Sequence, residues 1–238
     1  MALQYSFKRF EKKYFLTQTQ YQILLEQMRL HMKEDVYGQY TICNIYYDTD
    51  DWRLIRASIE KPVYKEKLRV RSYGTPRNGD KVFIELKKKF EGVVYKRRIT
   101  APVEQVEPYL AGRLALENTG QIGKEIEYFQ NFYHSRPRVY LSYDRAAFAG
   151  IDDPGMRITF DTNLRWRDHE VDLRAGNDGE LLIPEDRVLM EIKTAGGYPL
   201  WLSRLLADIC AFSNSFSKIG TCYTKFIIEK NKEARFSA

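Results

Sequence analysis

The chain has 238 residues, 44% of them apolar, and its 38 Lys and Arg side chains exceed its 32 Asp and Glu side chains to give a net charge of +6. This composition excludes a disordered chain and fits one soluble, strand-rich domain over residues 1–238. No apolar run approaches the roughly 20 residues that cross a bilayer, and the charged start is unlike a signal peptide, so we expect a cytoplasmic chain.

The predicted elements alternate between strands and helices. An amphipathic helix is expected over 18–33 after a short extended start, since its apolar residues recur at helical spacing. Runs of β-branched and aromatic residues then predict consecutive antiparallel strands over 41–47, 66–73, 82–90 and 93–100. Two short helices, three strands and a second amphipathic helix follow over 102–116, 123–135, 138–148, 157–163, 187–194 and 200–212. The segments at 74–80 and 91–92 are short enough for hairpin turns.

Charged side chains alternate with apolar ones in at least four of these strands. Residues two apart in a strand point to the same side of the sheet. Each charged set therefore shares one face of its strand: Lys67, Arg69 and Arg71; Glu85 and Lys87; Lys96 and Arg98; Glu191 and Lys193.

This alternation has two interpretations. The commoner one is a sheet with one face on the core and the other in water. Against it, residues 66–73 supply three cations on one face, and like charges on neighbouring strands repel unless an anion lies between them. A closed sheet of about eight strands would enclose a narrow lumen that long side chains could line. We therefore predict an α+β fold, a closed antiparallel eight-stranded β-tunnel (barrel) with helices packed outside and a cationic inner wall that binds a chain of phosphates.

An ordered set of short segments carries a family resemblance along nearly the whole chain: 10–14 (FEKKY), 45–51 (IYYDTDD), 68–74 (LRVRSYG), 83–87 (FIELK), 142–145 (SYDR), 190–193 (MEIK) and 216–218 (FSK). Each segment alone is a weak signal. In this order they resemble the polyphosphate-polymerase domain of the vacuolar transporter chaperone (VTC) complex, within the triphosphate tunnel metalloenzyme (CYTH-like) superfamily.

The resemblance implies an enzyme that transfers the γ-phosphate of ATP to a growing polyphosphate chain and releases ADP. It implies phosphate contacts from eight cations: Lys13, Arg69, Arg71, Lys87, Lys96, Arg145, Lys193 and Lys218. Tyr143 and Ser217 match positions that hydrogen-bond phosphate in the family, and Arg98 joins them as a phosphate-binding candidate because it shares a face with Lys96. Glu191 would hold a divalent metal ion, Mn²⁺ or Mg²⁺.

One departure from the family pattern bears on the chemistry. Tunnel triphosphatases typically open with Glu-x-Glu-x-Lys, whereas the corresponding residues here are Arg9, Glu11 and Lys13. A site with fewer carboxylates is less able to activate water, which favours the polymerase. Glu11 and Glu85 are weaker candidates for metal or orienting roles.

The sequence lacks the motifs of several other kinds of nucleotide-binding and metal-binding site. The sequence has no Gly-x-x-x-x-Gly-Lys-Ser/Thr loop, and its three cysteines form no CxxC pair, so neither a P-loop nor a zinc site is supported. Asp48, Asp50 and Asp51 lack the glycine and later glutamate of a calcium-binding EF-hand. We expect these acids to cap a helix or form a turn.

Two rival functions stay open. The first is a triphosphatase or adenylate-cyclase-like enzyme of the same fold, and the second is a non-catalytic binder of polyphosphate or nucleic acid. The expected partners are ATP and polyphosphate, without nucleic acid, because cations inside a narrow lumen cannot reach a duplex. A membrane protein working beside the chain and the oligomeric state are left open.

Overall fold

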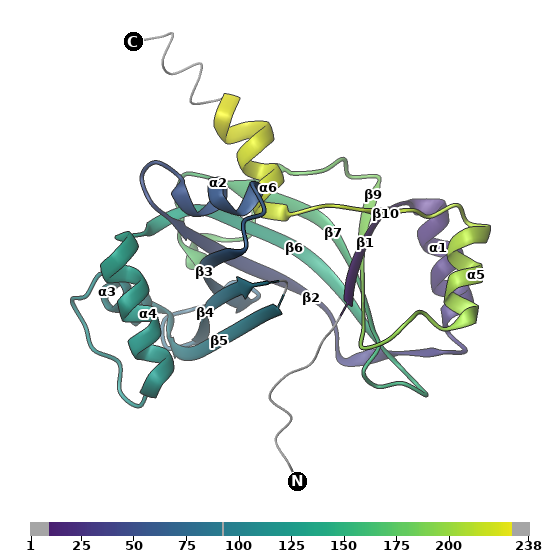
Figure 1. Ribbon diagram of the computed structural model, residues 1–238, viewed down its shortest axis with the longest axis horizontal. Helices are drawn as coiled ribbons and strands as arrows, with labels where there is room; N and C mark the ends of the chain where they lie inside the picture. The colour runs from purple at the N-terminus through teal and green to yellow at the C-terminus, as the bar shows by residue number, and fades with distance from the viewer. Residues whose placement is uncertain (1–9, 92, 230–238) are drawn as a thin grey trace. The chain divides into compact units, whose positions relative to one another are not determined.

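The computed structural model describes residues 10–91 and 93–229 of the chain (Figure 1). The strands are β1 (Phe10–Thr17), β2 (Met32–Asp48), β3 (Tyr64–Tyr73), β4 (Lys81–Phe90), β5 (Val93–Pro102), β6 (Arg136–Gly150), β7 (Arg157–Arg167), β8 (Glu180–Leu181), β9 (Arg187–Thr194) and β10 (Ser213–Asn214). The helices are α1 (Gln18–Met28), α2 (Arg53–Ile59), α3 (Val103–Leu110), α4 (Gly120–Tyr133), α5 (Leu200–Asp208) and α6 (Lys218–Cys222), with a 3₁₀ turn η1 (Leu173–Ala175) and a π-helical turn η2 (Tyr223–Ile227).

The strands form one ten-stranded sheet with the order β10-β1-β9-β7-β6-β2-β3-β4-β5, and β8 pairs with β7. This order is an open path with β10 and β5 at its ends, so the predicted closed eight-stranded β-tunnel is wrong for the described residues. Both ends are poor partners for closure. β10 has only two residues, and β5 carries three consecutive cations at positions 96–98, a feature that protects edge strands from pairing.

The chain divides into two compact units. Unit 1 comprises Met1–Thr41, Tyr143–Leu164 and Ile183–Phe216, and unit 2 comprises Ile42–Ser142, Arg165–Leu182 and Ser217–Ala238. Strands β2, β6 and β7 each contribute residues to both units. The expectation of a single domain stays a prediction.

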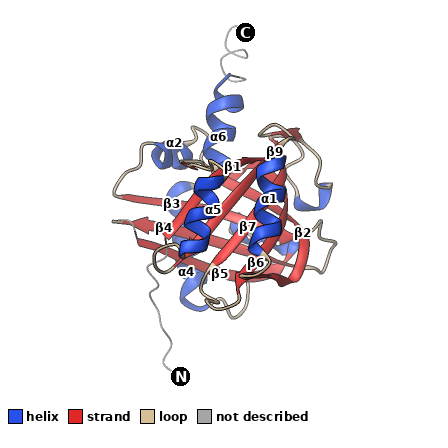
Figure 2. Ribbon diagram, turned by 90° about the vertical axis from the view of Figure 1, so that its right-hand side faces the viewer, coloured by secondary structure: helices blue, strands red, loops and turns tan. Residues whose placement is uncertain are grey.

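In unit 1 the apolar face of β1, β7 and β9 packs against two helices. Tyr14, Phe160 and Met190 lie on this face and share a core with Leu24 of α1 and Leu202 of α5. Figure 2 shows α1 and α5 side by side over the strands. Both amphipathic helices predicted from the sequence therefore cover the sheet as expected, although α1 ends at Met28, before the start of β2.

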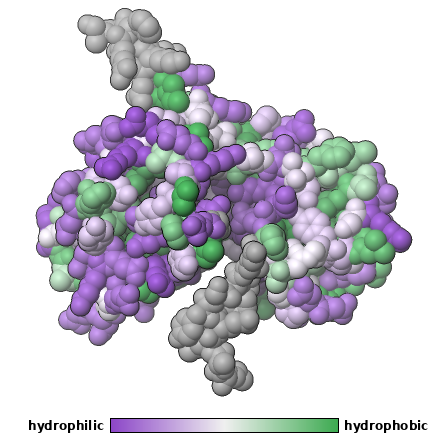
Figure 3. All heavy atoms as spheres, in the orientation of Figure 1, coloured by the Kyte–Doolittle hydropathy of each residue, from purple (hydrophilic) through white to green (hydrophobic). Residues whose placement is uncertain are grey.

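In unit 2 the apolar face of β3, β4 and β5 packs against α3 and α4 (Figure 1). Leu68, Ile84 and Ile99 lie on this face and belong to one core. At its rim, Glu125 of α4 pairs with Lys88 of β4 at 3.1 Å and with an arginine of β5 at 3.4 Å. Hydrophilic residues cover much of the surface over α4 and β5 (Figure 3). The alternation thus assigned the apolar positions of these strands to the correct face.

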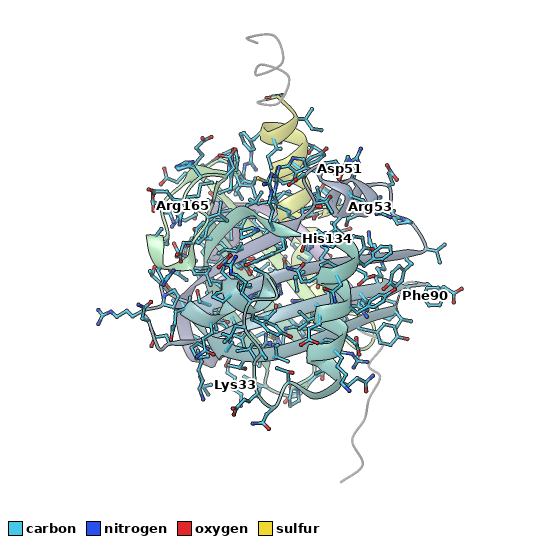
Figure 4. All side chains as sticks on the ribbon, turned by 90° about the vertical axis from the view of Figure 1, so that its left-hand side faces the viewer. Lys33, Asp51, Arg53, Phe90, His134 and Arg165 are labelled. Carbon is cyan, nitrogen blue, oxygen red and sulfur yellow. The ribbon has the colours of Figure 1, made fainter. Side chains whose placement is uncertain are left out.

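Helix α2, which follows β2, was not predicted. The carboxylate of Asp48 accepts hydrogen bonds from the backbone amides of Leu54 and Ile55, each at 2.9 Å, and so caps the first turn of α2. Asp51 and Arg53 mark this region in Figure 4. The expected capping role is therefore confirmed for Asp48. No helix in the described part of the chain is long and apolar enough to cross a membrane.

Candidate functional site: two cationic clusters

The charged face of unit 2 lies on β3, β4 and β5, opposite the face that packs against α3 and α4. The strand register pairs Arg69 with Glu85, and Glu85 with Arg98. Side chains at directly paired positions stand on the same face of an antiparallel sheet. Three charged residues from three strands therefore meet in one row.

The Glu85 carboxylate is the centre of this face, and its side chain is only 1% exposed. Its Oε2 accepts a hydrogen bond from Nε of Arg69 at 2.7 Å and lies 4.0 Å from Nε of Arg71. Its Oε1 accepts a hydrogen bond from Nε of Arg98 at 2.8 Å and lies 2.7 Å from Nζ of Lys96. We call Arg69, Arg71, Glu85, Lys96 and Arg98 the Glu85 cluster.

Charge and burial act in opposite directions in this cluster. Burial raises the pKa of Glu85, but the charges of Arg69 and Arg71 and the contact with Lys96 outweigh it, so the pKa falls well below its ordinary value. Burial lowers the pKa of Lys96, and Glu85 opposes that shift. Four cationic side chains around one ionised carboxylate leave an excess of positive charge, which attracts anions.

Strand β2 holds two of these arginines in place. The Oδ1 atom of Asn44 accepts a hydrogen bond from Nε of Arg71 at 3.0 Å, and its amide group donates one to the Leu141 carbonyl at 3.2 Å. The Tyr46 hydroxyl accepts a hydrogen bond from Nη1 of Arg69 at 3.4 Å. Our sequence analysis missed Asn44 and Tyr46, although the same period of two, extended to the predicted strand 41–47, would have found them.

The other predicted residues of unit 2 lie in two places. Lys87 pairs in register with Lys67 and Lys96 and so belongs to the charged face. Ser217 is the N-cap of α6, where its hydroxyl accepts a hydrogen bond from the backbone amide of Gly220 at 3.2 Å. Lys218 is the first residue of that helix. Phosphate binding by Ser217 and Lys218 stays a prediction.

A second cluster lies on the polar face of β1, β6, β7 and β9 in unit 1. We call it the Glu191 cluster: Glu11, Lys13, Arg145, Asp161, Glu191 and Lys193. The register pairs Lys13 with Glu191, and Glu11 with Lys193. Nζ of Lys193 lies 3.4 Å from Glu191 and 3.7 Å from Glu11, and Nζ of Lys13 lies 3.2 Å from Glu11. Positive and negative groups alternate here, unlike in the Glu85 cluster.

Arg145 is a largely buried cation of the Glu191 cluster, with its side chain 10% exposed. Its Nε and Nη2 atoms donate to the two oxygens of Asp161 at 2.6 and 2.7 Å, and Nη2 lies 3.7 Å from the Glu191 carboxylate. Burial lowers the pKa of Arg145, but the Asp161 carboxylate more than offsets this and raises the pKa above its ordinary value. The guanidinium also lies 5.1 Å from the centre of the Tyr143 ring. Sequence analysis missed Asp161, which fixes the direction of Arg145.

Thr159 of β7 stands on the same polar face and pairs in register with Glu191. The residue is 5% exposed, and its buried hydroxyl has no hydrogen-bond partner within the described part of the chain. Buried hydroxyl groups are usually satisfied, so an oxygen of a ligand could occupy this position. Nothing in the sequence singled out Thr159.

The donor set near Glu191 suits a metal ion only in part. Among the described residues, no group of three or more His, Cys, Asp and Glu side chains is arranged to hold a metal ion. Cationic groups of Arg145 and Lys193 lie beside the Glu191 carboxylate. Mg²⁺ is commonly held by one or two carboxylates together with substrate phosphates and water. Glu191 therefore fits a metal that arrives with a triphosphate.

The structure thus brings together the predicted residues in two sets. Arg69, Arg71, Lys96 and Arg98 surround Glu85 in unit 2. Lys13, Arg145 and Lys193 accompany Glu191 in unit 1. Their roles in phosphate and metal binding stay predictions. Arg9, on which the comparison with triphosphatases depended, lies outside the described residues.

Comparisons with known proteins agree with the resemblance. The VTC domain family matches residues 8–227. Subunit 4 of the vacuolar transporter chaperone complex from Schizosaccharomyces pombe is 28% identical over 159 residues, an alignment that covers 58% of this chain and 22% of the relative. The chain therefore matches about a fifth of the length of that protein.

Two solved structures share the fold at low sequence identity. A candidate adenylate cyclase from Bacillus halodurans has a TM-score of 0.51 and 13% identity, over 87% of this chain and 92% of that chain. A candidate adenylyl cyclase from Hippeastrum, described as having a dominant triphosphatase activity, has a TM-score of 0.51 and 17% identity, over 88% of this chain and 92% of that chain. These likenesses bear on the fold alone.

Proposed function

Because the chain belongs to the VTC domain family, we propose that it is an ATP-dependent polyphosphate polymerase that transfers the γ-phosphate of ATP to a growing polyphosphate chain. The observation that carries the proposal is the Glu85 cluster, in which four cations share one buried carboxylate. Arginine forks and lysine ammonium groups bind phosphate oxygens without reading a base. Such a surface suits a linear phosphate polymer.

The residues have distinct tasks in the proposed reaction. Phosphoryl transfer depends on alignment and on neutralising the charge of the transferred group. The arginines and Lys96 of the Glu85 cluster bind and orient phosphates, and Lys13, Lys193 and Lys218 contribute further cationic contacts. The attacking group is a terminal phosphate oxygen of polyphosphate, which is ionised at neutral pH, so the chain needs no general base.

Glu191 would hold a divalent metal ion together with the triphosphate, and Thr159 lies opposite it in the sheet. A bound metal polarises the γ-phosphate and neutralises charge on its oxygens. Lys193 and Arg145 lie 3.4 and 3.7 Å from the Glu191 carboxylate and orient it. The product assay described below, run with Mn²⁺ and with Mg²⁺, distinguishes the two metals.

The proposed partners are ATP and polyphosphate. Since the S. pombe relative is named as a subunit of a transporter chaperone complex, we include in the proposal a membrane protein complex beside which this chain acts. The cytoplasmic location stays a prediction.

Product analysis tests the function. The full chain is incubated with ATP and either metal, polyphosphate is resolved on a gel, and ADP and inorganic phosphate are quantified. We expect long phosphate chains and ADP. Release of inorganic phosphate without polymer would establish a triphosphatase instead, and binding of polyphosphate without either product would establish a non-catalytic binder.

Glu191→Gln tests the metal assignment. We expect turnover to fall about 100-fold, as when one stabilising group of a transition state is removed, while metal-free binding of tripolyphosphate persists. Glu185→Gln, at an exposed acid in the turn before β9, is the matched control and should keep full turnover. Retained turnover in Glu191→Gln would remove Glu191 from the metal site.

A further inference from the structure

A cavity of about 240 Å³ lies in unit 2, on the apolar face of β2 and β3. This is the face opposite the Glu85 cluster. Strand residues Ile45, Tyr47 and Val70 line the cavity together with Val106 of α3 and Leu173 of η1. Its volume corresponds to about eight water molecules at roughly 30 Å³ each. The cavity can therefore hold a small organic molecule and is lined mainly by aliphatic side chains.

Tyr47 gives this cavity a polar group. The residue is 5% exposed, and no other described residue hydrogen-bonds its hydroxyl. Burial raises the pKa of Tyr47, and the carboxylates of Glu107 and Asp172 raise it further. The hydroxyl thus stays protonated and lies within electrostatic reach of two acids that also line the cavity. Its oxygen is not among the buried, unsatisfied polar atoms of the described residues, so it reaches the cavity, where water or a ligand can hydrogen-bond it.

The charges at the cavity favour a cation. Three carboxylates line it, those of Glu104, Glu107 and Asp172, against the single guanidinium of Arg174. Arg174 pairs with Asp172 at 2.6 Å, and Arg113 pairs with Glu107 at 2.6 Å. Even with both arginines counted, carboxylates outnumber guanidinium groups. A phosphate would therefore be repelled here, in contrast to the Glu85 cluster.

We propose that this cavity binds a small organic cation with an aliphatic body, such as an alkylammonium ion. The aliphatic part contacts Val70, Val106 and Leu173, and the ammonium group lies at the Tyr47 hydroxyl and the carboxylate of Glu107. An ammonium offers three donors and no acceptor, which matches a hydroxyl oxygen beside carboxylates. The site does not depend on the proposed polymerase activity.

Three probes of equal chain length test the proposal on the full chain. n-Hexylamine, which is protonated at pH 7, n-hexanol and hexanoate are titrated by calorimetry, and the methyl resonances of Val70, Val106 and Leu173 are followed by NMR. We expect hexylammonium to bind at least about tenfold more tightly than hexanol or hexanoate, the factor typical of one hydrogen bond to a charged group. The methyl shifts should be confined to the cavity.

Two variants locate the polar contacts. Tyr47→Phe removes only the hydroxyl, and Glu107→Gln removes a charge at a solvent-exposed position where folding is not at risk. Each should weaken hexylammonium binding several-fold, whereas Glu117→Gln, at an exposed acid outside the cavity lining, should leave it unchanged. Absence of binding, equal binding of hexanol, or equal weakening in Glu117→Gln would each overturn the proposal.

Discussion

Replacing Glu85 by glutamine tests whether its carboxylate holds the Glu85 cluster together. The substitution keeps the size of the side chain and removes the only negative charge among four cations, of which Arg69 and Lys96 each lie 2.7 Å from it. The remaining cations would then repel one another across β3, β4 and β5. Glutamine can still accept hydrogen bonds, so the loss reports on charge.

The expected loss of stability in Glu85→Gln follows from the burial of the carboxylate. Removing one partner of a buried ion pair lowers the free energy of unfolding by about 3–5 kcal/mol. Lys96 and Arg98 are 44% and 34% exposed, so water screens part of their repulsion, and we expect about 3 kcal/mol, the lower end of that range. For a chain of this length each kcal/mol lowers the melting temperature by about 2–4 °C, which gives a decrease of about 6–12 °C.

The pH dependence of this loss has a definite sign. The pKa of Glu85 in the folded chain lies below its ordinary value of 4.5. Its stabilisation is therefore complete above pH 4.5 and declines as the pH falls through the folded-state pKa. The difference in melting temperature between wild type and Glu85→Gln should be largest at neutral pH and shrink in acid.

Thermal denaturation followed by circular dichroism measures the effect, with and without tripolyphosphate. The matched control is Glu125→Gln, which removes a 19% exposed carboxylate that pairs with two cations on the opposite face of the same strands, and it should cost about 1 kcal/mol or less. Tripolyphosphate should raise the melting temperature of Glu85→Gln more than that of wild type. Equal melting temperatures of Glu85→Gln and wild type at neutral pH would refute this account of the cluster.

Two further substitutions probe buried arginines. Asp161→Asn removes a fully buried carboxylate and leaves the largely buried Arg145 without its two-oxygen partner. It should lower the free energy of unfolding, measured by guanidinium denaturation, by about 3 kcal/mol. A decrease below about 0.5 kcal/mol, the usual effect of a surface substitution, would contradict the contact. Arg167, 3% exposed, donates to four backbone carbonyls between residues 170 and 178 at 2.7–3.2 Å. Because lysine lacks the planar fork of arginine, Arg167→Lys should lower the free energy of unfolding by at least about 2 kcal/mol. It should also speed proteolysis between residues 168 and 179. Unchanged cleavage would show that other contacts hold this segment.

The period-two alternation predicted the faces of the sheet correctly, because it depends only on local geometry. Arg69 and Arg98 meet at Glu85 although they belong to different strands, and the sequence placed each on the charged side of its own strand. Closure could not be predicted in this way. Alternation says which face a residue occupies, whereas pairing of the first and last strands depends on their lengths and edges, and β10 has only two residues.

The acids of the two clusters show a second feature that could not be predicted from the sequence, namely which cations each acid contacts. Glu85 was assigned a minor role and Asp161 none, since a lone acid in a strand of mixed charge carries no signal of its partners. Arg145 and Asp161 are sixteen residues apart and meet only because β6 and β7 bring them together. Thr159 is a similar case, because its unsatisfied hydroxyl becomes visible only once burial and register are known.

The buried carboxylate of Glu85 also bears on how a cationic surface can release a polyanion. Without a ligand, Glu85 neutralises part of the charge of Arg69 and Lys96 and holds both side chains in position, so little side-chain entropy remains to be lost on binding. A bound phosphate must compete with this carboxylate for the same donors, which limits its affinity. Glu85→Gln removes the competitor, and in the proposed polymerase reaction the tighter tripolyphosphate binding expected of this variant would slow product release. A polymerase that extends its product repeatedly needs that balance, whereas a storage protein would gain from losing the acid.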